Sequence, residues 1–272
     1  MPSYLVTGAS RGIGWELFRQ LASNADNTVI GLVRNKAETE KKVTDEFPAG
    51  GDRLHIIQGD ITDYASLQAA ATETAQITGG GLDYLIANAG VVSHFDAYDP
   101  IGVLGQNPTA LEEELTHLFK VNVVGNIHLF NVFIPLIQRG TAKKVIAISS
   151  GQAALDMIPK LKIEVASLYA ISKAALNTAV AKFGVQYAKE GILFLSVCPG
   201  MVDTGHYVDA TPEQMQGLMA MLGSFVEYAP HFKGPATTEA AVKDVLAVVE
   251  KASVEKGDAG AFVSHYGNQQ WL

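Results

Sequence analysis

The chain has 272 residues, of which 48% are hydrophobic and 18% are charged, and its formal net charge is -8. This composition supports a large buried core and excludes a disordered protein, and the negative charge disfavours nucleic acid or an anionic membrane surface as a partner. The length suits one α/β unit, so we expect a single domain over residues 1–272.

Short apolar runs alternate with helical stretches along most of the chain. Continuous apolar runs are typical of strands that are covered on both faces, and the alternation predicts an α/β fold with a doubly wound, parallel, seven-stranded sheet. The predicted strands are 4–7, 28–33, 54–58, 82–87, 145–149, 192–198 and 261–264, and the predicted helices are 14–23, 66–78, 110–139, 167–190 and 238–252.

A glycine-rich turn follows the first predicted strand. Glycines at such a junction let the backbone approach a pyrophosphate, whose charge is stabilised by the helix N-terminus. The alternative is a tight strand-to-helix connection without a ligand. The turn is Thr7-Gly8-Ala9-Ser10-Arg11-Gly12-Ile13-Gly14.

The end of the second strand indicates which nicotinamide cofactor binds. An acidic residue about 20 positions beyond the glycine turn is typical of NAD sites, whereas an arginine accommodates the 2′-phosphate of NADP. Arg34 stands at this place, and Arg11 adds a second guanidinium. We therefore expect NADPH/NADP+, although both arginines could instead be solvated surface cations.

Tyr169 and Lys173 form a candidate proton-transfer pair. Residues four apart share one face of a helix, and a nearby ammonium lowers the pKa of a phenol, which makes Tyr169 a usable general acid. Ser150 and its rival Ser149 end the fifth strand, where a hydroxyl could orient a carbonyl. A tyrosine and a lysine at this spacing also occur by chance on exposed helices.

Other motifs follow in a fixed order along residues 4–204. Together with the glycine turn, Ser150, Tyr169 and Lys173, they resemble the short-chain dehydrogenase/reductase family. The ending 260–267 resembles the NADPH-dependent carbonyl reductases and ketoreductases of the norsolorinic acid ketoreductase-like subgroup. The motifs are Asp60-Ile61, Asn88-Ala89-Gly90, Asn122 and Pro199-Gly200-Met201-Val202-Asp203-Thr204.

This resemblance implies that residues 1–272 form a single Rossmann-type catalytic domain. It also implies an NADPH-dependent reduction of a ketone to an alcohol. It favours Ser150 over Ser149, and Asn122 would bind a water that links Lys173 to solvent. The cofactor-binding residues would be Gly8, Ser10, Arg11, Gly12, Ile13, Gly14, Arg34, Asp60, Ile61, Asn88, Ala89, Gly90, Asn122, Tyr169, Lys173, Pro199, Gly200, Val202 and Thr204.

Three of these assignments have simpler alternatives. Asp60 could cap the helix that follows it, Asn122 could cap a helix irregularity, and Pro199-Gly200 could be an ordinary turn.

Residues 205–235 form a predicted substrate-binding insertion. Candidates to shape the pocket include His94, Phe95, Ala153, Leu155, His206, Tyr207, Met215, Met219, Leu222 and Phe225. We expect at least two of Met215, Met219 and Leu222 to pack on the core as part of an amphipathic helix. The resemblance implies a ketone or an aromatic polyketide as the substrate.

The remaining expectations concern surroundings and partners. Cys198 is expected to be a buried, inert thiol, no metal site is expected, and no stretch is expected to span a membrane. We expect a cytoplasmic protein, and the resemblance implies a homodimer or homotetramer. A dinucleotide-binding sensor without turnover and an NAD-linked alcohol dehydrogenase remain alternatives.

Overall fold

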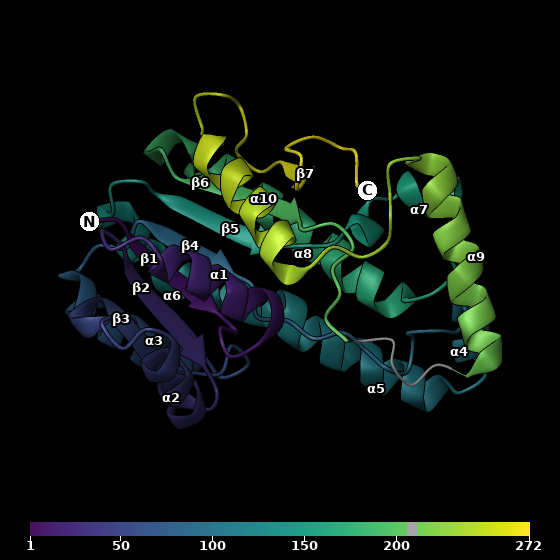
Figure 1. The fold of residues 1–272 in the computed structure, drawn as a ribbon, viewed down its shortest axis with the longest axis horizontal. Coiled ribbons are helices and arrows are strands. Elements are labelled where there is room, and N and C mark those ends of the chain that lie inside the picture. Colours follow the sequence, from purple (N-terminus) through teal and green to yellow (C-terminus); the bar gives the residue numbers. More distant parts are fainter. Residues whose placement is uncertain (206–210) are drawn as a thin grey trace.

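The computed structural model describes residues 1–205 and 211–272, and its centre is a seven-stranded parallel sheet (Figure 1). The strand order is β3-β2-β1-β4-β5-β6-β7, which confirms the predicted doubly wound fold. Because the order reverses between β1 and β4, a crevice is expected there at the carboxyl ends of the strands. The strands are β1 (Ser3–Thr7), β2 (Thr28–Val33), β3 (Leu54–Gln58), β4 (Tyr84–Ala87), β5 (Lys144–Ile148), β6 (Leu193–Cys198) and β7 (Phe262–Ser264).

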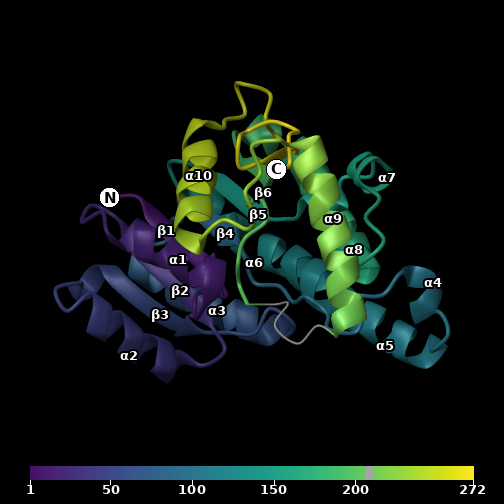
Figure 2. The same ribbon diagram turned by 45° about the vertical axis from the view of Figure 1, so that its right-hand side comes forward.

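Helices cover both faces of the sheet (Figures 1 and 2). One face packs against α1 (Gly12–Ala22), α2 (Lys36–Glu46) and α10 (Thr238–Lys251). The other packs against α3 (Tyr64–Thr78), α6 (Asn126–Arg139) and α8 (Ser167–Tyr187). This double coverage explains why the strands are apolar along almost their whole length. The short 3-10 turns are η1 (Gly51–Arg53), η3 (Gly151–Ala153) and η4 (Ala188–Glu190).

The predicted helix 110–139 consists of three segments. It divides into α5 (Pro108–Phe119), a π-helical turn η2 (Lys120–Gly125) and α6. The continuous stretch Pro108–Arg139 is long and apolar enough to cross a membrane by length and composition, with a mean hydropathy of 1.4 in its most apolar window. The expectation that no stretch reaches this length is therefore wrong, but 61% of that window is buried inside the fold, where α6 packs on the sheet.

Three further helices lie beyond the carboxyl ends of the strands (Figures 1 and 2): α4 (Ile101–Leu104), α7 (Met157–Leu161) and α9 (Pro212–Tyr228). The core face of α9 is formed by Leu218, Met221 and Phe225. Leu222 is partly buried against the same cluster, whereas Met215 and Met219 are exposed. The expectation that at least two of Met215, Met219 and Leu222 pack on the core is therefore wrong, because the buried stripe lies on the neighbouring residues of the helix.

Candidate active site

The glycine turn lies at the carboxyl end of β1, beside the point where the strand order reverses. Gly8 and Gly12 have φ angles of 69° and 55°, which side chains disfavour. A Cβ on Gly14 would lie 2.2 Å from the carbonyl oxygen of Gly8, so only glycine allows this close approach. The helix N-cap, Arg11, makes no side-chain hydrogen bond to α1, so no side-chain cap occupies the start of this helix, where an anion could accept the first N–H groups. The turn therefore fits a dinucleotide pyrophosphate.

Asn88 holds the same turn from β4. Its Nδ2 donates to the carbonyl of Thr7 at 2.9 Å, while Thr7 Oγ1 accepts the backbone N–H groups of Asn88 and Ala89. These bonds tie the loop after β4 to the loop after β1, and Gly90 follows them directly. A residue expected to bind the cofactor thus also supports the glycine turn.

Asp60 does not cap the following helix. Its Oδ1 accepts the backbone N–H and the hydroxyl of Thr62, each at 2.8 Å, and Asp63 is the N-cap of α3. The backbone hydrogen bond from Thr62 lowers the pKa of Asp60, and the charge of Arg34 contributes. The N-cap alternative for Asp60 is therefore wrong, and its carboxylate lies just beyond the carboxyl end of β3 with a lowered pKa.

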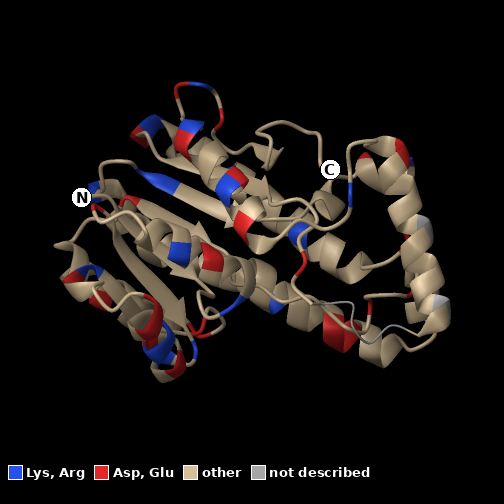
Figure 3. Cartoon of the chain, in the orientation of Figure 1, with Lys and Arg blue, Asp and Glu red and all other residues tan. Residues whose placement is uncertain are grey.

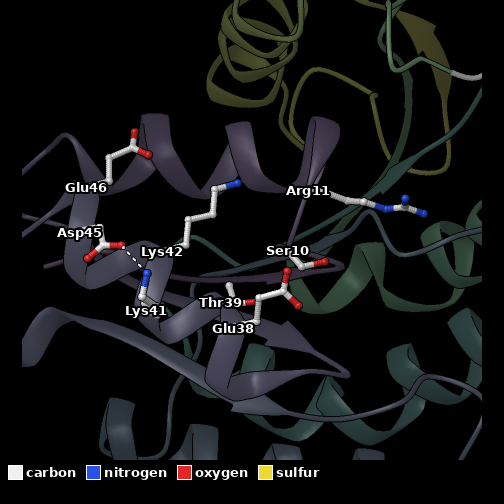
Figure 4. Close-up of a pocket in the computed structure, with 8 residues that line it drawn as sticks. All are labelled: Ser10, Arg11, Glu38, Thr39, Lys41, Lys42, Asp45 and Glu46. Carbon is white, nitrogen blue, oxygen red and sulfur yellow. Dashed lines mark hydrogen bonds and ion pairs between the residues drawn. The ribbon is translucent and has the colours of Figure 1, made fainter.

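An open groove lies between the glycine turn and α2 (Figure 4). Its volume is about 650 Å³ and its walls carry both signs of charge, including a Lys41–Asp45 pair at 3.4 Å. Figure 4 shows the Arg11 side chain extending away from the other labelled residues. The groove is lined by Ser10, Arg11, Glu38, Thr39, Lys41, Lys42, Asp45 and Glu46, so it does not include the candidate catalytic residues.

Helix α8 brings Tyr169 and Lys173 together. Lys173 is almost completely buried, its Nζ donates to the carbonyl of Ile148 at 2.9 Å, and it lies 5.7 Å from the centroid of the Tyr169 ring. Burial lowers the pKa of Lys173 to about 8. The lysine is thus held at the end of β5, with a pKa below that of a solvated lysine.

Ser149 and Ser150 differ in exposure. Ser149 is buried, with 3% of its surface exposed, and its backbone N–H donates to Val197 in the sheet. Ser150 is half-buried, and its Oγ accepts the N–H of Gln152 at 3.3 Å. Only Ser150 therefore presents a partly accessible side chain at the carboxyl end of β5.

Asn122 lies in the π-helical turn η2. Its Oδ1 accepts the N–H of Val91 at 2.8 Å, and its Nδ2 donates to the Val91 carbonyl at 2.9 Å and to Ser172 Oγ at 3.0 Å. The alternative of an asparagine at a helix irregularity agrees with this position. Sequence reasoning missed Ser172, because nothing in the local pattern connects it to a side chain 50 residues away.

The segment after β6 reaches the same edge of the sheet. Gly200 has a φ of 81°, and a Cβ there would lie 2.8 Å from the His265 ring. Val202 pairs with Ala236, and Thr204 is exposed. His206 and Tyr207 lie outside the described residues. Pro199 and Gly200 thus join the site at the end of β6, as an ordered strand-to-loop turn.

Cys198 is buried beneath these loops and accepts the N–H groups of Gly151 and Gly200. Burial raises the pKa of its thiol to about 11, which agrees with the expected inert cysteine. Within residues 1–205 and 211–272, no group of three or more histidine, cysteine or acidic side chains could hold a metal ion.

The apolar cluster around α7 and α9 includes the candidate pocket residue Phe225. It also includes Trp271, which packs closely against Gly151. A Cβ atom added to Gly151 would lie 3.2 Å from the Cβ of Trp271. Leu155 is 77% exposed, and Ala153 is buried. The end of the sheet beneath α7 and α9 is therefore mainly apolar.

Comparisons with known proteins agree with this architecture. Residues 3–215 match the family model for short chain dehydrogenases. The chain is 60% identical over 272 residues to short chain dehydrogenase virK of Hypocrea virens, and 45% identical to short-chain dehydrogenase/reductase AacuF of Aspergillus aculeatus, each match covering 100% of both chains.

Among solved structures, the carbonyl reductase from chicken fatty liver, with NADPH bound, superposes with a TM-score of 0.76 at 24% identity over 98% of each chain. A short chain dehydrogenase from Burkholderia cenocepacia, in complex with NADP, gives a TM-score of 0.72 at 24% identity, covering 98% of this chain and 97% of that one. These two likenesses show the fold. By its family match and its sequence relatives, the chain belongs to the short-chain dehydrogenase/reductase family of oxidoreductases.

Proposed function

We propose that the protein is an NADPH-dependent reductase that converts a ketone into an alcohol, with Tyr169 as the general acid. The observation that carries this proposal is the buried Lys173, held at Ile148 beside Tyr169 at the carboxyl edge of the sheet. NADPH, when bound, supplies the hydride. The protein must then provide a proton and an oriented carbonyl.

The residues divide these tasks. Tyr169 donates the proton to the nascent alkoxide oxygen, and the Lys173 ammonium favours the phenolate that remains. Ser150 donates a hydrogen bond to the carbonyl oxygen and orients it. Asn122 fixes the loop at Val91 against α8, which keeps Tyr169 and Lys173 in place. Asn122 would also bind the water that resupplies the proton of Lys173.

The cofactor would lie across the reversal in strand order, from the glycine turn to the segment after β6. Arg11 and Arg34 are exposed beside the turn, where they would bind the 2′-phosphate. Two structural neighbours solved with NADPH or NADP support this choice. The contacts would come from the glycine turn, Asp60-Ile61, Asn88-Ala89-Gly90 and the segment Pro199, Gly200, Val202 and Thr204.

The substrate would be an apolar ketone of aromatic polyketide type. Support comes from the apolar cluster around α7 and α9, and from Met215 and Met219, which α9 leaves exposed at the carboxyl side of the sheet. This agrees with the resemblance to the norsolorinic acid ketoreductase-like subgroup.

The test is a fluorescence titration with NADPH and with NADH, followed by NADPH consumption on a panel of ketones and quinones. We expect tight NADPH binding, consumption on aromatic ketones, and a loss of about 10²- to 10⁴-fold in kcat for Tyr169→Phe at saturating NADPH. Full activity of Tyr169→Phe would refute the assigned proton donor. Tight binding without turnover on any carbonyl would instead favour a dinucleotide sensor.

We further propose that two copies pair through α5 and α8. Exposed apolar side chains on these helices support this: Ile171 and Val185 on α8 are 43% and 80% exposed, and Phe119 on α5 is 40% exposed. Light scattering should give a dimer or tetramer mass for the protein, and Val185→Lys should lower that mass.

A further inference from the structure

Asp96 is a completely buried carboxylate in the loop between β4 and α4. Its Oδ2 accepts the backbone N–H groups of Leu168 at 2.7 Å and of Tyr169 at 2.9 Å. Its backbone carbonyl accepts the N–H of Ala166 at 2.7 Å. One residue thus binds three donors at the start of α8, the helix that bears Tyr169 and Lys173.

Helix α8 has no cap of its own. Its N-cap residue is Ala166, whose φ is 56° and whose methyl group accepts no hydrogen bond. Because the first N–H groups of a helix have no partner within the helix, they need an acceptor from elsewhere. Asp96 supplies that acceptor from a distant part of the chain, and Ser93 Oγ in turn accepts the N–H groups of Phe95 and Asp96.

Apolar contacts hold the same turn from another side. Leu168 is buried with Leu104 and Leu118, and Phe95, beside Asp96, packs against this cluster. The other end of the loop is attached to Asn122 through Val91. The loop after β4 is therefore fastened both to α8 and to η2.

Asp96 and Ile148 hold different parts of the catalytic pair. Asp96 binds the backbone of Tyr169, whereas Ile148 binds the side chain of Lys173 one turn further along α8. If the first turn of α8 moved, the Tyr169 phenol would shift relative to Lys173, which has a separate attachment. Small displacements of a catalytic group are costly, since reaction requires close alignment.

We propose that Asp96 is a positioning residue for the proton donor: through its hydrogen bonds to the backbone of Leu168 and Tyr169, it places the Tyr169 phenol for proton transfer. This inference rests on the proposed function, in which Tyr169 is the general acid. Asp96 itself touches neither substrate nor cofactor in this account.

The experiment compares Asp96→Ala with Asp96→Asn, measuring kcat at saturating NADPH and ketone, NADPH affinity by fluorescence, and backbone hydrogen exchange. We expect Asp96→Ala to lower kcat by about 10- to 100-fold, leave NADPH affinity unchanged, and accelerate exchange at residues 166–170. Asp96→Asn retains an oxygen acceptor and should recover most of the lost kcat.

Asp63→Ala is the matched control. Asp63 caps α3 in the same way, accepting the N–H groups of Ala65 and Ser66. Its loss should destabilise the protein but leave kcat at saturating NADPH unchanged. If Asp63→Ala lowered kcat as much as Asp96→Ala, a general loss of helix capping would explain the effect and the proposal would be wrong.

Three other results would also overturn the proposal: full kcat in Asp96→Ala, no recovery in Asp96→Asn, or unchanged exchange at residues 166–170. If Asp96→Ala does not fold, Asp96→Glu replaces it, because the longer side chain carries its acceptor oxygens one methylene further from the backbone. A folded Asp96→Glu variant with wild-type kcat would refute the inference. Wild-type protein that reduces no ketone would refute the proposed function instead, while exchange would still decide whether Asp96 holds the turn.

Discussion

Helices α2 and α9 lie at opposite ends of the carboxyl edge of the sheet, and they differ in how many charged residues they carry. Most residues of α2 are charged, whereas Glu227 is the one charged residue among the α9 side chains that the structure describes (Figure 3). Helix α2 lines the groove beside the glycine turn, and α9 packs with its apolar stripe on the cluster that it shares with α7.

The difference follows from what each region is proposed to bind. A phosphate-bearing cofactor requires charged and polar groups at set positions, while an apolar ketone is bound by surface burial and shape. Between the two lies α8, whose polar contacts to Asp96, Asn122 and Ile148 are independent of both helices. We therefore expect that changes in α9 leave the positions of Tyr169 and Lys173 undisturbed.

The largest effect is expected from replacing Lys173, which lies on α8 between these two regions. We expect Lys173→Met to lower kcat by about 10²- to 10⁴-fold, because the ammonium that favours the Tyr169 phenolate is lost. Steady-state NADPH consumption measures this. Activity close to wild type would show that α8 does not supply the proton-transfer pair.

The pH dependence should come from the same lysine. With a pKa of about 8, Lys173 carries its charge below that pH and loses it above. The value of kcat/KM for reduction should therefore fall as the pH rises through about 8, and this limb should be absent from the residual activity of Lys173→Met. The folded protein should also gain stability between pH 8 and the ordinary lysine pKa, since the unfolded chain binds the proton there and the folded chain does not.

A substitution in the buried face of α9 should lower the free energy of unfolding more than it affects cofactor binding. Phe225 is 4% exposed in the cluster shared by α7 and α9, and Phe225→Ala should lower the free energy of unfolding by about 3–5 kcal/mol. Denaturant titration measures the loss. In the folded fraction, the NADPH affinity should match wild type, and a parallel loss of NADPH affinity would contradict the separation of the two regions.

On the cofactor side, Arg34→Ala should weaken NADPH binding by about 10- to 100-fold, which corresponds to the loss of charge-assisted hydrogen bonds to a phosphate. NADH binding should be unchanged, because NADH lacks the 2′-phosphate. Arg53→Ala, on η1 near Asn24, provides a matched control that should leave both affinities intact. Equal losses for NADPH and NADH would remove the assigned role of Arg34.

The smallest effect is expected at an exposed position of α9. Met219 is 60% exposed, so Met219→Gln should leave stability within about 0.5 kcal/mol of wild type. If α9 covers the substrate, KM for an apolar ketone should rise a few-fold while kcat stays constant. This is expected when the lost contact stabilised the bound substrate and the transition state equally. An unchanged KM across the ketone panel would place the substrate away from this face.

Much of the fold and of the candidate site was predictable from local patterns. The apolar runs predicted all seven strands, with errors of one or two residues at their ends, because both faces of a parallel sheet are buried. The glycine turn was predictable because its backbone conformation depends on residues adjacent in sequence. Helix α2 was missed, since most of its residues are charged and its buried face consists of Thr39 and Val43 alone.

Only the tertiary structure decided what joins distant segments. The break between α5 and α6 coincides with an Asn122 side chain that binds Val91, and the cap of α8 comes from Asp96 rather than from Ala166. Periodicity and propensity describe neighbours along the chain, so they carry no record of such contacts. The sequence by itself determined the sheet, the glycine turn and the spacing of Tyr169 and Lys173. The packing of loops against α8 decided how Tyr169 is held, because its position depends on hydrogen-bond donors and acceptors that only folding brings together.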